Sequence, residues 1–128
     1  GLKKIEGILV QEMVSGNEIA IGMKRDEQFG PVLMAGLGGI FIEIIKDVTF
    51  RVAPIEKAEA MEMIKELKGY KLLQGFRGKP GVNIDKLAAL IVNVSNMVVK
   101  ENKVMALDFN PVIANDKSVV VADFRVII

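Results

Sequence analysis

The 128-residue sequence contains no cysteine and no histidine, and these two absences exclude many kinds of site. Without cysteine, the chain can form no disulfide, no thiolate metal site and no cysteine nucleophile. Without histidine, it lacks the commonest general base, the commonest zinc ligand and a Ser-His triad. The chemistry that this chain carries must use carboxylates, amides, lysines and arginines.

The charge and hydropathy of the chain argue against further classes of protein. The formal net charge is only +1, which gives no electrostatic case for binding nucleic acid or an anionic membrane. The longest apolar run is far shorter than the roughly 20 residues of a transmembrane helix, and no signal-peptide pattern is present. A chain of 128 residues, of which 51% are hydrophobic and 26% charged, is long enough and apolar enough to form one domain with a sizeable core. The plentiful Lys and Glu favour a thermophilic cytosolic source.

The first half of the chain reads mainly as strands. Period-two patterns rich in Val and Ile predict strands at about 5–13, 18–25, 31–35, 40–48 and 49–52. A helix is also possible at 40–48, but the density of Ile, Phe and Val and the preceding glycines favour a strand. The turn cluster at 15–17 predicts that the first two strands form a hairpin. The sequence opens at Gly1, almost inside a strand pattern, so we expect it to be part of a longer protein.

Two helices and a second strand pair complete the pattern. An apolar stripe predicts a helix over 56–67, and a clear 3.6 period predicts another over 84–100, with Asn83 as its N-cap. Residues 68–82 form a long Gly-rich connection, typical of a functional or mobile loop. Residues 104–128 close the chain as a hairpin. This order predicts an α+β fold, with an antiparallel sheet and two main helices packed on one face.

The closing hairpin carries a possible cation site. If the turn is centred between Asn115 and Asp116, paired residue numbers sum to 231, and Asp108 lies opposite Asp123. Asn110, two residues from Asp108, shares their face. Two carboxylates and an amide would suit a hard cation such as Mg²⁺. The alternative is a solvated hairpin whose charges point outward.

Glycines and arginines give weaker signals for anion binding. The turn at residues 36–39, GLGG, could bring backbone N–H groups to a phosphate, or it could simply reverse the chain. It is not a dinucleotide fingerprint, because no helix follows directly, and no P-loop is present. The four arginines, Arg25, Arg51, Arg77 and Arg125, could hold phosphate or carboxylate groups, or form structural salt bridges.

Residues 10–18, VQEMVSGNE, could cradle a flat heterocycle and a ribose. In this interpretation Gln11 and Glu12 lie near the base, and Glu18 accepts hydrogen bonds from the sugar hydroxyls. The alternative is an ordinary hairpin with polar tips.

Together, these motifs resemble an ATP-grasp nucleotide-binding fold. More closely, they resemble the beta subunits of ADP-forming acetyl-CoA synthetases, which are kin of succinyl-CoA synthetase beta. The segments that carry the resemblance are residues 10–55, which include FGPVLMAGLGGIFIEI, residues 72–78, LLQGFRG, and the final LDFNPV and VVADFRV. The resemblance covers nearly the whole chain. It implies the C-terminal part of the fold, because the usual N-terminal lobe with its phosphate-binding lysine is missing; residues 1–128 would then form a single subdomain.

The resemblance also implies roles for individual residues. By their motif positions, Gln11, Glu12 and Val14 would contact adenine and Glu18 the ribose. Asn110 and Asp123 match the Mg²⁺ ligands of the family, with Asp108 beside them where related enzymes often carry Glu. The further residues expected near the phosphates are Lys24, Arg25, Gly38 and Gly39.

The family reaction converts acyl-CoA, ADP and phosphate into acid, CoA and ATP, reversibly and with Mg²⁺. A histidine on the CoA-binding alpha subunit carries the phosphoryl group, so this chain would hold no catalytic residue of its own and would act within a hetero-oligomer. It would be inactive as an isolated chain.

Two alternatives to this function stay open. One is another ATP-grasp enzyme, such as a carboxylate–amine ligase or a synthetase-like acyltransferase. The other is a non-catalytic assembly module.

Overall fold

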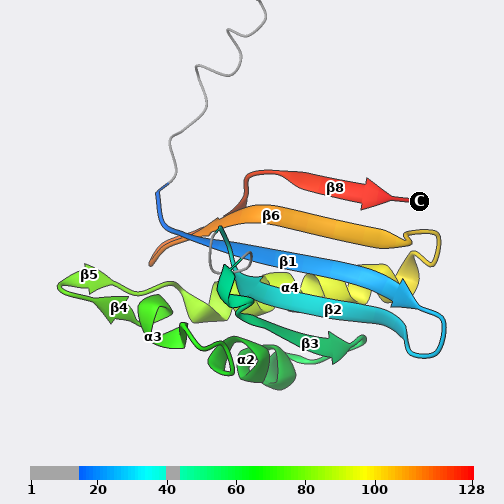
Figure 1. The fold of residues 1–128 in the computed structure, drawn as a ribbon, viewed down its shortest axis with the longest axis horizontal. Helices are drawn as coiled ribbons and strands as arrows, with labels where there is room; N and C mark the ends of the chain where they lie inside the picture. The colour runs from blue at the N-terminus through cyan, green and yellow to red at the C-terminus, as the bar shows by residue number, and fades with distance from the viewer. Residues whose placement is uncertain (1–14, 40–43) are drawn as a thin grey trace, which may run out of the picture.

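The computed structural model describes residues 15–39 and 44–128, and Figure 1 shows them as one main sheet with helices on one side of it. The predicted strand at 5–13 and the three predicted adenine-contacting residues, Gln11, Glu12 and Val14, lie outside the described residues.

The main sheet has six strands in the order β3-β2-β1-β6-β7, and β8 also pairs with β6. Every pairing in it is antiparallel, as predicted. The strands are β1 (Asn17–Asp26), β2 (Gly30–Leu37), β3 (Val48–Val52), β6 (Ala106–Ala114), β7 (Val119–Val121) and β8 (Phe124–Ile127).

Three helices are described, and the two longer ones lie where the sequence predicts them. They are α2 (Lys57–Lys65), α3 (Tyr70–Leu73) and α4 (Ile84–Lys100). The Asn83 side chain accepts a hydrogen bond of 3.0 Å from the Lys86 N–H, so it caps α4 as expected. None of the described helices is long and apolar enough to cross a membrane.

Two sequence-based predictions about strands and loops are wrong. A third, the hairpin between residues 5–13 and 18–25, involves residues 5–13, which lie outside the described residues; β1 pairs with β2 along one edge and with β6 along the other. The predicted strand at 40–48 is not formed at residues 44–47, since β3 begins only at Val48. The connection at 68–82 is not structureless: it contains α3 and a small hairpin of β4 (Gly75–Phe76) and β5 (Lys79–Pro80).

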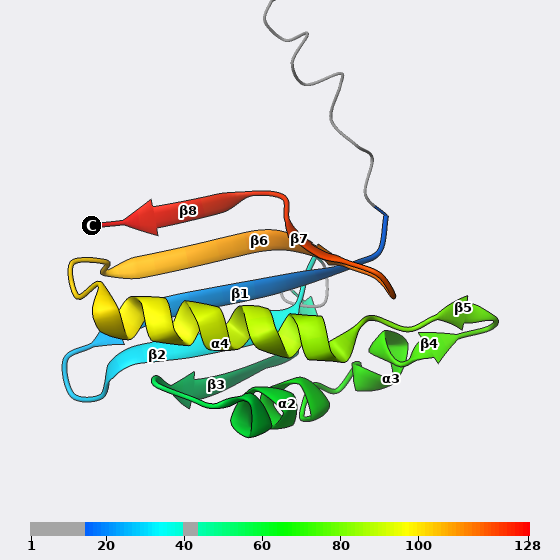
Figure 2. The ribbon, with the colours of Figure 1, turned by 180° about the vertical axis from the view of Figure 1, so that it is seen from behind.

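The helices cover only one face of the main sheet, which we call the helix face (Figure 2). Alternate residues of each strand point to opposite faces, and those on the helix face form the core with α2 and α4. Fully buried examples are Ile19, Ile21, Leu33, Met63, Leu87 and Ile91. No described helix packs on the other face, which we call the open face. It includes Glu18, Gly22, Lys24, Met34 and Phe50.

Candidate functional site

The closing hairpin has a different register from the one predicted. Paired residue numbers sum to 233, as in Val112 with Val121, so the turn is centred one residue later, between Asp116 and Lys117. The cause is the Asn115 side chain, whose Oδ1 accepts hydrogen bonds of 2.9 Å from the N–H groups of Lys117 and Ser118. Asn115 is therefore the first residue of the turn rather than a central one.

The corrected register changes which polar residues face one another. Asp108 lies opposite Arg125 rather than opposite Asp123. Asp123 lies opposite Asn110, whose N–H donates a 3.1 Å hydrogen bond to the Asp123 carbonyl. A shift of two in the sum leaves each side chain on the same face. The three predicted oxygen-bearing side chains, Asp108, Asn110 and Asp123, therefore still share the open face, and all three are exposed.

A β-bulge changes the direction of β6 next to Asn110. Ile19 pairs with Val112 and Ile21 pairs with Phe109, so two β6 residues, Asn110 and Pro111, oppose the single residue Ala20 of β1. Bulges bend a strand and redirect side chains, and they are common beside active sites. Here the bulge lets residues before and after it pack on the helix face, while Asn110 keeps its amide on the open face.

The donor set suits a magnesium ion that is bound to phosphates. Among residues 15–39 and 44–128, no three Asp or Glu side chains are grouped closely enough to hold a metal ion by themselves. Mg²⁺ typically takes one or two protein carboxylates and completes its octahedron with water and substrate phosphates. Asp123 and the Asn110 amide, with Asp108 two residue pairs away on the same face, would supply such a partial set of oxygen ligands.

The structure brings Glu18 together with the glycine turn. Gly38 donates a 2.7 Å hydrogen bond to the Glu18 carbonyl, and a Cβ at Gly38 would lie only 3.1 Å from the Glu18 Cβ. Gly39 has a φ of +64°, a conformation that favours glycine. These three residues line an open groove of about 1500 Å³, together with the turn at 115–118 and Arg77 of the β4–β5 hairpin. The groove is wide enough for a nucleoside.

Lys24 and Arg25 lie on opposite faces of the sheet, so they cannot act together on phosphates. Lys24 is exposed on the open face. Arg25 points to the helix face, where its Nε donates to the Val104 carbonyl at 2.6 Å and its Nη2 donates to the carbonyls of Val98 and Glu101. It caps the C-terminal end of α4. Because its guanidinium is held by these carbonyls on the helix face, Arg25 is not positioned to bind a nucleotide on the open face.

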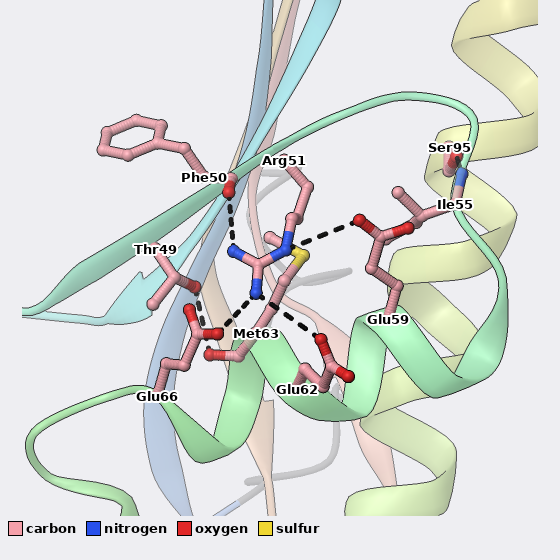
Figure 3. Close-up of polar contacts among 9 residues, drawn as sticks. All are labelled: Thr49, Phe50, Arg51, Ile55, Glu59, Glu62, Met63, Glu66 and Ser95. Carbon is pink, nitrogen blue, oxygen red and sulfur yellow. Dashed lines mark hydrogen bonds and ion pairs between the residues drawn. The ribbon is translucent and has the colours of Figure 1, made fainter.

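Arg51 also has a structural role, which Figure 3 shows. Its guanidinium pairs with three carboxylates along α2: Glu66 at 2.5 Å, Glu59 at 3.6 Å and Glu62 at 4.0 Å. The hydrogen bond to Glu66 is the main cause that raises the pKa of Arg51 above its ordinary value. These contacts fasten α2 to β3 and leave Arg51 away from the open face.

Three buried polar residues join loops and helices to the rest of the fold, and no sequence pattern points to them. Asp47 is buried and accepts hydrogen bonds from the N–H groups of Lys68 at 2.6 Å and Gly69 at 2.7 Å. The Thr49 hydroxyl donates to the Met63 carbonyl, and the Ser95 hydroxyl accepts from Ile55 N–H (Figure 3). Each partner is at least 14 residues away along the chain, so local patterns do not reveal these bonds.

The comparisons with known proteins point to one family. Residues 2–128 match the family described as "ATP-grasp domain". The chain is 46% identical over 126 residues to "Acetate--CoA ligase [ADP-forming] I" of Archaeoglobus fulgidus, covering 98% of this chain and 18% of the relative. It is 47% identical over 123 residues to "Acetate--CoA ligase [ADP-forming] I subunit beta" of Pyrococcus furiosus, covering 95% of this chain and 53% of the relative.

A solved structure agrees with the sequence matches. It is an acetyl-coenzyme A synthetase of Ca. Korarchaeum cryptofilum, in complex with coenzyme A and Mg-AMPPCP, whose phosphohistidine segment points towards the nucleotide-binding site. It is 40% identical, with a TM-score of 0.89, covering 99% of this chain and 62% of that one. This chain thus spans only part of each relative. Since the family match extends over nearly its whole length, the chain belongs to the ATP-grasp domain family.

Proposed function

We propose that this chain is the C-terminal part of the ATP-grasp unit in an ADP-forming acid–CoA ligase. The observation that carries the proposal is the placement of Glu18 and the facing pair Asn110 and Asp123 on one open sheet face, where no described helix packs. A ribose-binding carboxylate and a cation-binding pair then share one surface. The relatives named as ADP-forming acetate–CoA ligases support the reaction class.

In this proposal each part of the open face holds one part of the nucleotide. Glu18 accepts hydrogen bonds from the ribose hydroxyls, beside the Gly38–Gly39 turn. Asn110 and Asp123 hold Mg²⁺, and Asp108 acts from two residue pairs away on the same face. A cation held there would supply positive charge to offset the negative charge that develops during phosphoryl transfer. By their motif positions, Gln11, Glu12 and Val14 are proposed to contact adenine.

The phosphoryl carrier in the proposed reaction is a histidine on a CoA-binding alpha subunit. This chain contains no histidine, so the nucleophile must come from elsewhere. The P. furiosus relative is named as a beta subunit, and the solved Korarchaeum synthetase has a phosphohistidine segment. In the ATP-forming direction, the P–N bond of phosphohistidine breaks and a β-phosphate oxygen of ADP forms the new P–O bond. The electron pair of the P–N bond returns to the imidazole nitrogen.

The proposal is tested with the intact protein that contains this chain, assembled with its partner. We expect ATP to form from ADP and phosphate only when acetyl-CoA or another acyl-CoA is present, with transient labelling of a partner histidine by radioactive phosphate. An assembly that binds Mg-ADP but instead joins a carboxylate to an amine would replace the proposal with another ATP-grasp activity. If Mg-ADP and Mg-ATP fail to raise its melting temperature, the chain does not bind nucleotide.

A further inference from the structure

Arg125 is the arginine whose role the candidate site leaves unexplained. It lies on β8 directly opposite Asp108 of β6, and its side chain is exposed on the open face. Within residues 15–39 and 44–128, no carboxylate oxygen lies within 4.0 Å of its guanidinium; the arginine ion pairs found there are those of Arg51. Arg25 and Arg51, by contrast, are bonded on the helix face.

The position of Arg125 follows from the order of residues along the open face. On β1, Glu18 lies opposite Ile113, Ala20 faces the bulge that contains Asn110, and Gly22 lies opposite Asp108. A nucleotide whose ribose is at Glu18 and whose cation is at Asn110 and Asp123 therefore runs along β1 from Glu18 towards Gly22. The γ-phosphate is the end of the nucleotide opposite the ribose, so it would lie beyond Asn110 and Asp123, on the side farther from Glu18. That side is the residue pair of Asp108 and Arg125.

The surface beyond this pair has room for a phosphoryl acceptor. A depression of about 550 Å³ lies on the open face on the β1 side of Asp108, over β1, β2, β3 and β6, and its lining includes Gly22, Lys24, Met34, Phe50 and Asp108. Gly22 presents no side chain at its centre, and a Cβ there would lie 3.2 Å from the Leu107 carbonyl oxygen. The apolar Met34 and Phe50 form one wall, which suits a flat ring such as imidazole better than it suits a phosphate.

From this arrangement we infer that Arg125 binds the phosphoryl group during its transfer between the nucleotide and the acceptor. This inference rests on the proposed function. The transferred group carries its charge on three equatorial oxygens, and a planar guanidinium can donate to two of them at once. As the bond from phosphorus to the β–γ bridging oxygen breaks and the bond to the acceptor nitrogen forms, Arg125 follows the phosphoryl oxygens. Asp108 lies opposite Arg125 in the strand pair, and its carboxylate does not contact the guanidinium.

The test compares phosphoryl transfer with nucleotide binding in the assembled protein. Arg125→Gln is expected to slow single-turnover labelling of the acceptor from radioactive γ-labelled ATP by about 10³-fold, the lower end of the range for an arginine that stabilises this transition state. Arg125→Lys should recover part of the rate. The affinity for Mg-ADP, which lacks the γ-phosphate, should change by less than about threefold, a shift well under 1 kcal/mol. Lys103→Gln removes an exposed charge from the turn before β6 and should behave as the wild type.

Each outcome decides between clear alternatives. Slow transfer with retained Mg-ADP affinity and an unchanged melting temperature supports the role of Arg125. A normal transfer rate in Arg125→Gln overturns it and leaves the proposed function intact. Parallel losses of transfer, Mg-ADP affinity and melting temperature also overturn it, because Arg125 would then act on the fold. If even the wild type neither binds Mg-ADP nor labels the acceptor, the proposed function itself fails.

Discussion

The two faces of the main sheet use the same kinds of side chain for different purposes. On the helix face, the cations Arg25 and Arg51 are bonded to α4 carbonyls and α2 carboxylates, respectively. On the open face, Lys24 and Arg125 are exposed, and no described helix packs over them. The same contrast holds for the carboxylates. Asp47 is buried and accepts two backbone hydrogen bonds, whereas Asp123 is exposed.

This difference shows which residues stabilise the fold and which are available for a ligand. Charged groups on the helix face satisfy the ends of helices and loops, so removing them should change stability. Charged groups on the open face make few contacts within the described residues, so removing them should change binding and leave stability nearly unaltered. Substitutions on each face test this division.

The largest effect on stability is expected from the apolar core of the helix face. Leu33 of β2 is fully buried, and Leu33→Ala should lower the free energy of unfolding by about 3–5 kcal/mol through lost burial and a residual cavity. Val52 lies on the edge strand β3 and is 46% exposed, so Val52→Ala should change the free energy of unfolding by no more than about 0.5 kcal/mol. Equilibrium urea unfolding of the intact protein measures both. Equal losses would contradict the division between the faces.

Arg25→Met is expected to be the next largest change. It removes a cation that donates to the carbonyls of Val98, Glu101 and Val104 at the end of α4, and should cost about 2–3 kcal/mol of unfolding free energy. Urea unfolding measures the cost, and calorimetry of the folded protein should show unchanged Mg-ADP affinity. Lys24→Met, the adjacent open-face change, is the matched control for stability. A loss of nucleotide binding without a loss of stability in Arg25→Met would restore the sequence-based prediction for this residue.

The smallest effect is expected at Arg51. Its three glutamate partners are about half exposed or more, so solvent screens the pairs and Arg51→Gln should cost about 1 kcal/mol or less. The pKa of Arg51 is raised, so its stabilising charge is present at every pH below its unfolded value and is lost only as the pH rises through the higher folded value. Salt is therefore the better probe. In about 1 M NaCl the difference between Arg51→Gln and the wild type should shrink, and a difference independent of salt would indicate packing instead.

The sequence was sufficient for elements with strong periodicity. The 3.6 period and the Asn83 cap located α4, and the alternation at 18–25 located β1. It failed where long-range contacts or turn chemistry decide the structure. Residues 40–48 are rich in Ile, Phe and Val, yet the strand that pairs with β2 begins only at Val48, opposite Gly36. The glycines of residues 68–82 led to the prediction of a loop, although these residues include the β4–β5 hairpin.

The sequence predicted which side chains of the closing hairpin share a face, but it predicted the wrong cross-strand partners for them. Residue alternation predicted that Asp108, Asn110 and Asp123 share a face, because that depends only on parity. Their partners depended on the turn, and the sequence could not tell whether Asn115 begins the turn or lies at its centre. Nor could it separate Lys24 from Arg25 by role, because the carbonyls that hold Arg25 lie more than 70 residues away.

The central claim is that Asn110 on β6 and Asp123, the residue before β8, face each other and hold a nucleotide-bound Mg²⁺. Titration calorimetry of Mg-ADP into the intact protein tests it most directly, with Glu27→Gln, an exposed change in the β1–β2 turn, as the control. Asn110→Ala and Asp123→Ala should each weaken Mg-dependent binding by about 100-fold or more, since changes to groups behind a metal ligand alone cost roughly 10–100-fold. Their melting temperatures should stay near the wild-type value. Unchanged Mg-ADP affinity in both variants would contradict the account.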